Sequence, residues 1–218
     1  MDGVVVDSEP TYMDWLRCFL KEEKVFVSEA ELCSMVGISA QNYKRYLQKW
    51  WIRAGKEPIS GERLYRIFDM FCEKYAVTFK KLQNPYVEEV MCSLKKGGYQ
   101  IALASSSPMK DILKVLRETN LMRFVDEIIS GNDCRESKPH PEIYCRVMEK
   151  LKLKNTECIA VEDSPYGIQA ARNAGIVVAA KREERFGFSQ DEAEYLLDNL
   201  HQIIPLIEKI NELNKSYS

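Results

Sequence analysis

Hydrophobic positions follow a helical spacing through the first third of the chain. Within residues 9–23 they recur at steps of three and four residues, as a helix with one apolar face requires. Ser28 followed by Glu31 resembles a capping box at the start of a second helix. Residues 39–54 and 61–75 repeat the amphipathic spacing. These patterns predict an all-α segment of about four helices.

The spacing changes after Pro85, where short apolar runs alternate with helical stretches. The expected strands are residues 99–104, 126–130, 158–161 and 176–180, and the expected helices include residues 86–96 and 108–121. Gly97 and Gly98 end the first of these helices, because glycine suits a helix C-terminus. Strands that alternate with helices form right-handed crossovers and a parallel sheet. The prediction is an α/β fold, with a Rossmann-like parallel sheet flanked by helices and the all-α segment inserted into it.

Serines follow the first expected strand, and ligands gather at such carboxyl ends in parallel sheets. Ser105 and Ser106 lie directly after it, where hydroxyls beside helix N-terminal amides suit a phosphate oxygen. Ser107 is expected to cap a helix that begins at Pro108. The cluster is therefore a candidate phosphate-binding loop.

Charged residues follow two further expected strands. Lys138 lies in a loop that prolines make rigid, so its ammonium could neutralise a transferring phosphoryl group. His140, between two prolines, has no evident catalytic partner. Glu162 and Asp163 end a buried strand side by side, where their mutual repulsion is unfavourable. Binding of Mg²⁺, which prefers carboxylate oxygens, would remove that repulsion.

The residues Asp2 and Gly3 leave two interpretations open. Asp2 could serve as a general acid/base beside another carboxylate two residues earlier, because a step of two places both on one side of an extended chain. Alternatively, Asp-Gly forms a turn, with a helix N-cap at Asp7 or Ser8. Asp7 is expected to be structural in both cases.

Composition and charge restrict the expected partners and location of the protein but do not indicate a reaction. A net charge of −2 argues against a duplex-DNA or anionic-membrane surface. No apolar run approaches the roughly 20 residues that span a bilayer, and the N-terminus lacks a secretory signal pattern. The seven cysteines are scattered without metal-binding spacing, as expected of thiols in a reducing cytosol. We therefore expect a cytoplasmic monomer that binds neither nucleic acid nor membrane.

Taken in order, these clusters resemble the four motifs of the haloacid dehalogenase (HAD) superfamily. That family's first motif reads Asp-x-Asp-Gly-(apolar run)-Asp-(Ser/Thr)-Glu, and residues 1–9 match it from the second position onward. Asp2 then matches the second aspartate, and nothing stands for the first. Ser105, Lys138 and Glu162-Asp163 match the second, third and fourth motifs. The flanking sequences are similar to the branch that contains β-phosphoglucomutase and small-molecule phosphatases.

The resemblance implies a core domain of residues 1–9 and 82–218 and a helical cap of residues 10–81. It also implies that the first aspartate attacks phosphorus, forming an aspartyl-phosphate that water hydrolyses. Asp2 would protonate the leaving group and activate the water. Its backbone carbonyl, the carboxylate of the unmatched first aspartate and Asp163 would hold Mg²⁺, with Glu162 in support.

The same resemblance assigns substrate contacts. Ser105, Ser106 and Lys138 would bind the phosphoryl oxygens. Gly37 and Ser39 belong to a cap loop that would face the substrate.

The cap separates two activities within this branch. The mutases carry a histidine where this chain has Tyr12, and an arginine that grips a second phosphate where it has Ala40. We therefore expect a Mg²⁺-dependent phosphohydrolase acting on a small, sugar-phosphate-like phosphomonoester. A phosphosugar mutase and a non-catalytic phosphate- or partner-binding protein are the alternatives. Trp50 and Trp51 are expected to form cap core rather than a sugar platform.

Three explanations of the unmatched first aspartate compete. The natural protein is longer, or the chain is a variant that no longer catalyses, or the resemblance misleads. We favour the first, because a sheet without its central strand would expose unpaired backbone groups and an apolar slot. The chain from Met1 is expected to be inactive.

Overall fold

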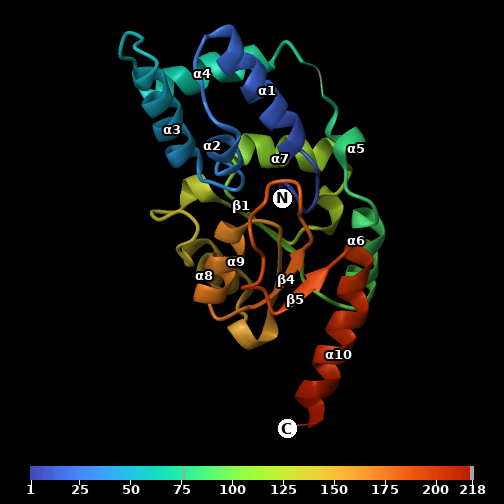
Figure 1. The fold of residues 1–218 in the computed structure, drawn as a ribbon. Helices are drawn as coiled ribbons and strands as arrows, with labels where there is room; N and C mark the ends of the chain where they lie inside the picture. Colours follow the sequence, from blue (N-terminus) through green and yellow to red (C-terminus); the bar gives the residue numbers. More distant parts are fainter. Residues whose placement is uncertain (76, 217–218) are drawn as a thin grey trace.

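The computed structural model describes residues 1–75 and 77–216. It has an α/β fold in which a helical cap covers one end of a core built from parallel strands and helices (Figure 1). The cap helices are α1 (Glu9–Glu22), α2 (Glu29–Cys33), α3 (Ala40–Arg53) and α4 (Gly61–Cys72). The predicted capping box is confirmed, because Ser28 and Glu31 each accept a hydrogen bond from the other's backbone N–H.

The cap has its own hydrophobic cluster, which we call the cap cluster. Its buried members are Met13, Leu16, Phe19, Leu20, Val25, Leu32, Met35, Val36, Leu47, Trp50, Leu64, Phe68 and Phe71. Trp50 is buried and Trp51 packs against the cluster, so their expected role as core is confirmed. Phe79, which the expected boundary assigns to the cap, packs in the core instead. The boundaries at residues 10 and 81 remain a prediction.

The described strands form two parallel sheets. The first contains β1 (Ala102–Ser105) and β2 (Glu127–Ser130). The second contains β3 (Ile159–Glu162), β4 (Val177–Lys181) and β5 (Tyr195–Leu197) in that order. All pairs are parallel, as predicted, and the pairs Ser105 with Ser130 and Glu162 with Ala180 lie at the carboxyl ends. The sequence analysis missed β5.

Within residues 1–75 and 77–216, β1 and β3 each pair on one edge only, whereas β4 pairs on both. We call their free sides the open edges. Alternate residues of β1 and β3 are partly exposed, while the middle three residues of β4 are buried. Interior parallel strands are normally buried on both faces. One hydrophobic cluster nevertheless spans both sheets and includes Val5 and Val6.

Helices flank the strands of the core. They are α5 (Phe79–Leu82), α6 (Val87–Lys96), α7 (Met109–Glu118), α8 (Glu142–Leu151), α9 (Pro165–Asn173) and α10 (Ile203–Ser216), with short 3₁₀ turns η1 (Met122–Phe124), η2 (Gly131–Asp133), η3 (Asn155–Glu157) and η4 (Leu200–Gln202). Gly97 follows α6 as predicted, and Gly98 has a φ of +81°. In Figure 1, α10 extends from the core at the end opposite the cap. None of the helices in the described ranges is long and apolar enough to cross a membrane.

The chain crosses between core and cap at two places that are hydrogen-bonded to each other. Val6 forms an antiparallel bridge with Gln83, and the N–H of Asp7 donates to the carbonyl of Leu82 at 2.7 Å. The side-chain amide of Asn84 donates to two carbonyl oxygens of the N-terminal loop at 2.9 and 2.8 Å. The two crossings therefore form one connected hinge.

A loop after β4 fastens this hinge. Arg185 donates to both carboxylate oxygens of Asp7, at 2.8 and 2.7 Å, and also contacts Glu183. The hydrogen bonds from Arg185 lower the pKa of Asp7. Phe186 and Phe188 of the same loop pack against the cap cluster. Asp7 is thus a structural residue, as the sequence predicted.

Candidate active site

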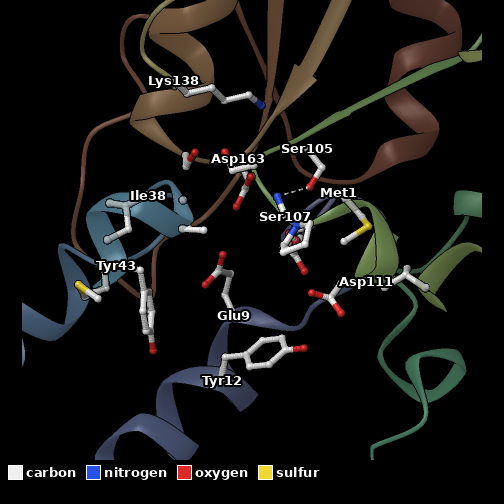
Figure 2. A pocket seen from close by; sticks show the side chains of 18 of the residues that line it. Met1, Glu9, Tyr12, Ile38, Tyr43, Ser105, Ser107, Asp111, Lys138 and Asp163 are labelled. Atoms are coloured by element: carbon white, nitrogen blue, oxygen red, sulfur yellow. Dashed lines mark hydrogen bonds between the residues drawn. The ribbon is translucent and has the colours of Figure 1, made fainter. Parts of the chain in front are cut away.

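A pocket of about 220 Å³ lies between the cap and the carboxyl ends of the strands (Figure 2). The predicted site residues that line it are Asp2, Gly37, Ser105, Ser106, Lys138, Glu162 and Asp163. Ser39 lines an adjoining pocket together with Ser106 and Lys138. The hydroxyl of Ser39 also accepts the N–H of Asn42 and so caps α3. Residues far apart in the sequence therefore converge on one site.

Lys138 and Glu162 form a buried ion pair on the core side of the pocket. The Nζ of Lys138 donates to Glu162 at 2.5 Å and to the carbonyl of Ala104 at 3.2 Å. The hydroxyl of Tyr144 donates to the same Glu162 oxygen. Burial raises the pKa of Glu162, but the charges of Lys138 and of the chain's N-terminus, together with the hydrogen bonds from Lys138 and Tyr144, leave that pKa below its usual value. Lys138 is thereby fixed between the ends of β1 and β3.

Asp163 is a buried carboxylic acid, 6% exposed, that faces the pocket. In the described part of the chain, its carboxylate has no hydrogen bond or ion pair. Burial and the adjacent charge of Glu162 raise its pKa. The carboxylate lies against Gly3, where a Cβ would come within 1.9 Å of Oδ2. Only glycine permits this approach, and the φ of +72° at Gly3 favours glycine as well.

Asp2 is held by two serine hydroxyls. Ser8 donates to one carboxylate oxygen at 2.6 Å, and Ser107 donates to the other at 2.8 Å. The expectation that Ser107 caps a helix beginning at Pro108 is wrong. Helix α7 begins at Met109 without a side-chain cap, because the hydroxyl of Ser107 is bonded to Asp2. The N–H of Ser107 donates to Ser105 Oγ at 3.1 Å, which orients that hydroxyl.

The cap approaches the core closely at this pocket. Gly37 has a φ of +75°, and a Cβ there would lie 2.5 Å from the hydroxyl oxygen of Ser164. Glu9, the first residue of α1, points into the pocket (Figure 2). Burial raises the pKa of Glu9, and the charges of Asp2 and Asp163 raise it further. The structure therefore represents a closed arrangement of cap and core.

Comparison with known proteins agrees with this geometry. The family model of haloacid dehalogenase-like hydrolases matches residues 1–181. The chain belongs to this family. A phosphorylated carbohydrates phosphatase from Thermotoga maritima is 29% identical over 181 residues, 81% of this chain and 79% of that protein. A phosphoglycolate phosphatase from Vibrio vulnificus is 28% identical over 157 residues, 68% of each chain.

A solved structure confirms the fold. The crystal structure of a β-phosphoglucomutase from Clostridium difficile matches with a TM-score of 0.78, at 21% identity, over 97% of this chain and 95% of that chain. The predicted Rossmann-like core with a helical cap is therefore confirmed. At this level of identity the likeness concerns the fold alone.

The sequence analysis missed several residues of this HAD-type pocket. Ser8, Glu9, Ser107 and Tyr144 all contact the predicted site residues or line the pocket. Ser8 and Glu9 stand within the first motif and could have been included on that ground. Tyr144 and Glu162 are 18 positions apart, and no local spacing links them.

The donor set at this pocket partly fits the divalent cation associated with HAD enzymes. Among the described residues the carboxylate of buried Asp163 has no hydrogen-bonding partner, and it lies against Gly3. Glu162 is engaged by Lys138 and Tyr144. Across the described ranges, no group of three His, Cys, Asp or Glu side chains is arranged to hold a metal ion. Asp163 therefore needs further oxygen ligands to complete a magnesium site.

Proposed function

We propose that this protein is a Mg²⁺-dependent hydrolase of small, sugar-phosphate-like phosphomonoesters that acts through an aspartyl-phosphate. The observation that carries the proposal is the convergence of Asp2, Ser105, Lys138 and Asp163 on one pocket at the carboxyl ends of parallel strands. The relatives named for phosphorylated carbohydrates and for phosphoglycolate support hydrolysis of a phosphomonoester. They differ in the leaving group, which is the part of the substrate that the cap encloses.

Different residues of the pocket bind the phosphoryl group and transfer protons. The hydroxyls of Ser105 and Ser106 and the ammonium of Lys138 bind the phosphoryl oxygens and stabilise charge that develops there. Asp2 gives a proton to the departing alkoxide and later takes a proton from the attacking water. Its hydrogen bonds to Ser8 and Ser107 hold the carboxyl in position for both steps.

Asp163 and the backbone carbonyl of Asp2 would hold Mg²⁺. When bound, the ion orients the phosphate and neutralises part of its charge. Glu162 acts indirectly, because its carboxylate binds Lys138 and Tyr144. The buried pair of Lys138 and Glu162 keeps the ammonium directed at the pocket.

We assign the nucleophile to an aspartate two positions before Asp2, on a strand that enters between the open edges of β1 and β3. Both edges belong to parallel strands whose carboxyl ends reach the pocket. A strand there would pair on both sides and deliver its last residues beside Lys138 and Asp163. A chain that begins at Met1 is expected to be nearly inert.

Phosphate release from p-nitrophenyl phosphate and from sugar phosphates tests the proposal. The chain from Met1 and a form extended by an N-terminal segment that supplies the motif's first aspartate are compared with Mg²⁺ and with EDTA. The extended form is expected to be active, and EDTA or Asp163→Asn should abolish its activity. The control Asp133→Asn changes an exposed carboxylate of η2 and should have no effect.

The opposite outcome is equally defined. If the extended form stays inactive with Mg²⁺ and Asp163→Ala changes nothing, the enzyme assignment fails. Binding of phosphate esters without turnover would then favour a non-catalytic phosphate-binding protein. Conversion of a sugar phosphate into its isomer without net phosphate release would favour the mutase.

A further inference from the structure

We infer that the cap side of the pocket selects phosphomonoesters with a neutral or cationic, hydroxyl-bearing leaving group, and that Asp111 excludes a second anion. This inference rests on the proposed function, because it assumes that the phosphate occupies the end of the pocket near Ser105 and Lys138. The leaving group then lies among the remaining lining residues.

The charged side chains on the leaving-group side of the pocket are all negative. Away from Asp2, Glu162 and Asp163, the charged lining residues are Glu9, Asp69 and Asp111. Of the residues lining the pocket in the described ranges, Lys138 is the one with a cationic side chain, and it is paired with Glu162. A carboxylate or second phosphate on the leaving group would therefore meet like charges without a compensating base. Juxtaposed like charges are an effective means of rejecting a ligand.

Asp111 differs from Asp69 in its surroundings. Asp69 is exposed, and its carboxylate lies 3.8 Å from the ammonium of Lys110. Asp111 is half-buried in the first turn of α7, and its carboxylate has no hydrogen bond or ion pair in the described ranges. Burial raises its pKa, and the charges of Asp69 and Asp2 raise it further. The charges of Lys110 and Lys114 oppose them without reversing the shift in pKa. Figure 2 shows this carboxylate directed toward Tyr12 and the space beside Glu9, where a leaving group would lie.

Tyrosine hydroxyls supply the complementary hydrogen-bonding groups. Tyr12, Tyr43 and Tyr65 line the pocket, and none of their hydroxyls bonds to another described residue. Burial raises the pKa of Tyr65 to about 12, so this hydroxyl stays protonated and can both donate and accept. The ring of Tyr43 is held by Tyr65 at 5.8 Å and by Phe68 at 6.0 Å. Such fixed hydroxyls match a polyol, whose hydroxyls also donate and accept.

The volume sets the size of the ligand. At about 220 Å³ the pocket is smaller than the roughly 300 Å³ at which pockets for drug-sized ligands begin. A small metabolite fits, and an oligosaccharide or nucleic acid does not. A polyol or amino alcohol phosphate combines the expected size, charge and hydroxyl content.

Isothermal titration of the protein in the presence of Mg²⁺ tests the inference. The probes are sorbitol 6-phosphate, serinol phosphate and phosphoglycolate, which carry neutral, cationic and anionic leaving groups, the first two with free hydroxyls. Sorbitol 6-phosphate and serinol phosphate should each bind at least about tenfold more tightly than phosphoglycolate. Equal affinity for phosphoglycolate, or no binding of sorbitol 6-phosphate, overturns the inference.

Variants locate the effect. Asp111→Asn should reduce the preference for sorbitol 6-phosphate over phosphoglycolate by about tenfold. Asp111→Glu keeps the charge and the acidic first turn of α7, so it should retain the preference. The matched control Asp69→Asn removes a compensated charge and should change the preference by less than about twofold. If Asp111→Asn and Asp69→Asn reduced the preference equally, the exclusion of anionic leaving groups would come from the total negative charge of the pocket, and the specific role of Asp111 would be overturned.

The phosphatase assay separates this inference from the proposed function. Hydrolysis of p-nitrophenyl phosphate by the extended form, with no preference among the three esters, would sink the inference alone. A preserved preference in titration, with no hydrolysis of any ester, would sink the proposed function alone.

Discussion

Asp163 is the residue at which stability and function oppose each other. Its carboxylate is buried beside Glu162 and lacks a hydrogen-bonding partner in the described ranges. Burial without a partner disfavours the ionised form and so raises the pKa. A cation at the pocket would reverse that preference. The same feature that weakens the fold would favour the proposed binding of Mg²⁺ at Asp163.

Asp163→Asn is expected to raise the free energy of unfolding at pH 7 in EDTA by about 1–2 kcal/mol. At low pH the carboxyl of Asp163 is protonated in both the folded and the unfolded protein, so its ionisation does not affect stability there. As pH rises above the ordinary value of 3.8, the unfolded state ionises first and the wild type loses stability until the folded-state pKa is passed. Urea denaturation at pH 4 and pH 7 should show that Asp163→Asn has a higher free energy of unfolding than the wild type at pH 7 only. A gain that is independent of pH would contradict this account.

Tyr144→Phe removes one of the two groups that donate to Glu162. Because Glu162 stays buried beside Lys138, the loss should lower the free energy of unfolding by about 1–3 kcal/mol. Tyr43→Phe is the matched control, since the hydroxyl of Tyr43 has no partner among the described residues, and it should change stability by less than about 0.5 kcal/mol. Chemical denaturation of both variants provides the measurement. Equal losses would show that the contact with Glu162 contributes nothing specific.

At the scale of elements, the loop between α2 and α3 determines how closely the cap meets the core. Gly37 in this loop lies directly against Ser164, whose hydroxyl caps α9. Ser164 is buried and cannot move aside without losing that cap. Closure of the pocket therefore depends on the absence of a Cβ atom at Gly37.

Gly37→Ala and Gly55→Ala form a matched pair. Both glycines have a positive φ, +75° and +71°, so each alanine carries a similar backbone strain of about 1 kcal/mol. Only the alanine at position 37 meets neighbours, with Ser164 atoms at 2.5 and 2.6 Å, while position 55 has nothing within 4 Å. Gly37→Ala should therefore lower the free energy of unfolding by a further ~1–3 kcal/mol, or shift the equilibrium between open and closed cap toward the open form by about the same free energy. Denaturation and limited proteolysis of the cap linkers measure the difference, and identical behaviour of the two variants would refute the close contact.

The sequence predicted elements whose signals are local. The cap helices followed from apolar spacing, and Ser28 with Glu31 marked the start of α2 correctly. The strands before Ser105 and Asp163 were found as apolar runs, with ends shifted by one to three residues. Strand β5 has only three residues and gives no comparable run. Helix α10 continues to Ser216, and residues 217–218 lie outside the described part.

The errors arose where a distant partner outweighed a local rule. Ser107 before Pro108 has the pattern of a helix cap, yet its hydroxyl binds Asp2, 105 positions away. Tyr144 is linked to Glu162 only through the meeting of α8 and β3. Motif order predicted which residues would gather in the pocket. It could not predict their hydrogen bonds, which depend on the packed geometry.

Across the whole molecule, strand pairing is uneven. In the described ranges β4 is paired on both edges, whereas β1 and β3 each keep an open edge. Backbone amides that face an open edge lack the hydrogen bonds that protect a central strand. The carboxyl ends of these two incompletely paired strands reach the pocket where chemistry is proposed.

Amide hydrogen exchange should reveal this difference. Peptides covering β4 should exchange more slowly than peptides covering β1 or β3 in the chain from Met1. In the extended form, exchange in β1 and β3 should slow, while β4 should change little. Mass spectrometry of both forms measures this, and unchanged protection of β1 and β3 would remove the support for a strand between them.

The hinge between cap and core has a consequence for the timing of proton transfer. The crossings at Asp7 and Leu82 are bonded to each other, so they bend together and the cap swings as one lid. Ser8 sits at this pivot and donates to Asp2. A swing that carries Ser8 away leaves the Asp2 carboxyl with Ser107 alone and free to rotate. Under the proposed function, both serines would hold the Asp2 carboxyl only while the cap is closed over a bound ester, so proton transfer to water in the open form would be slow.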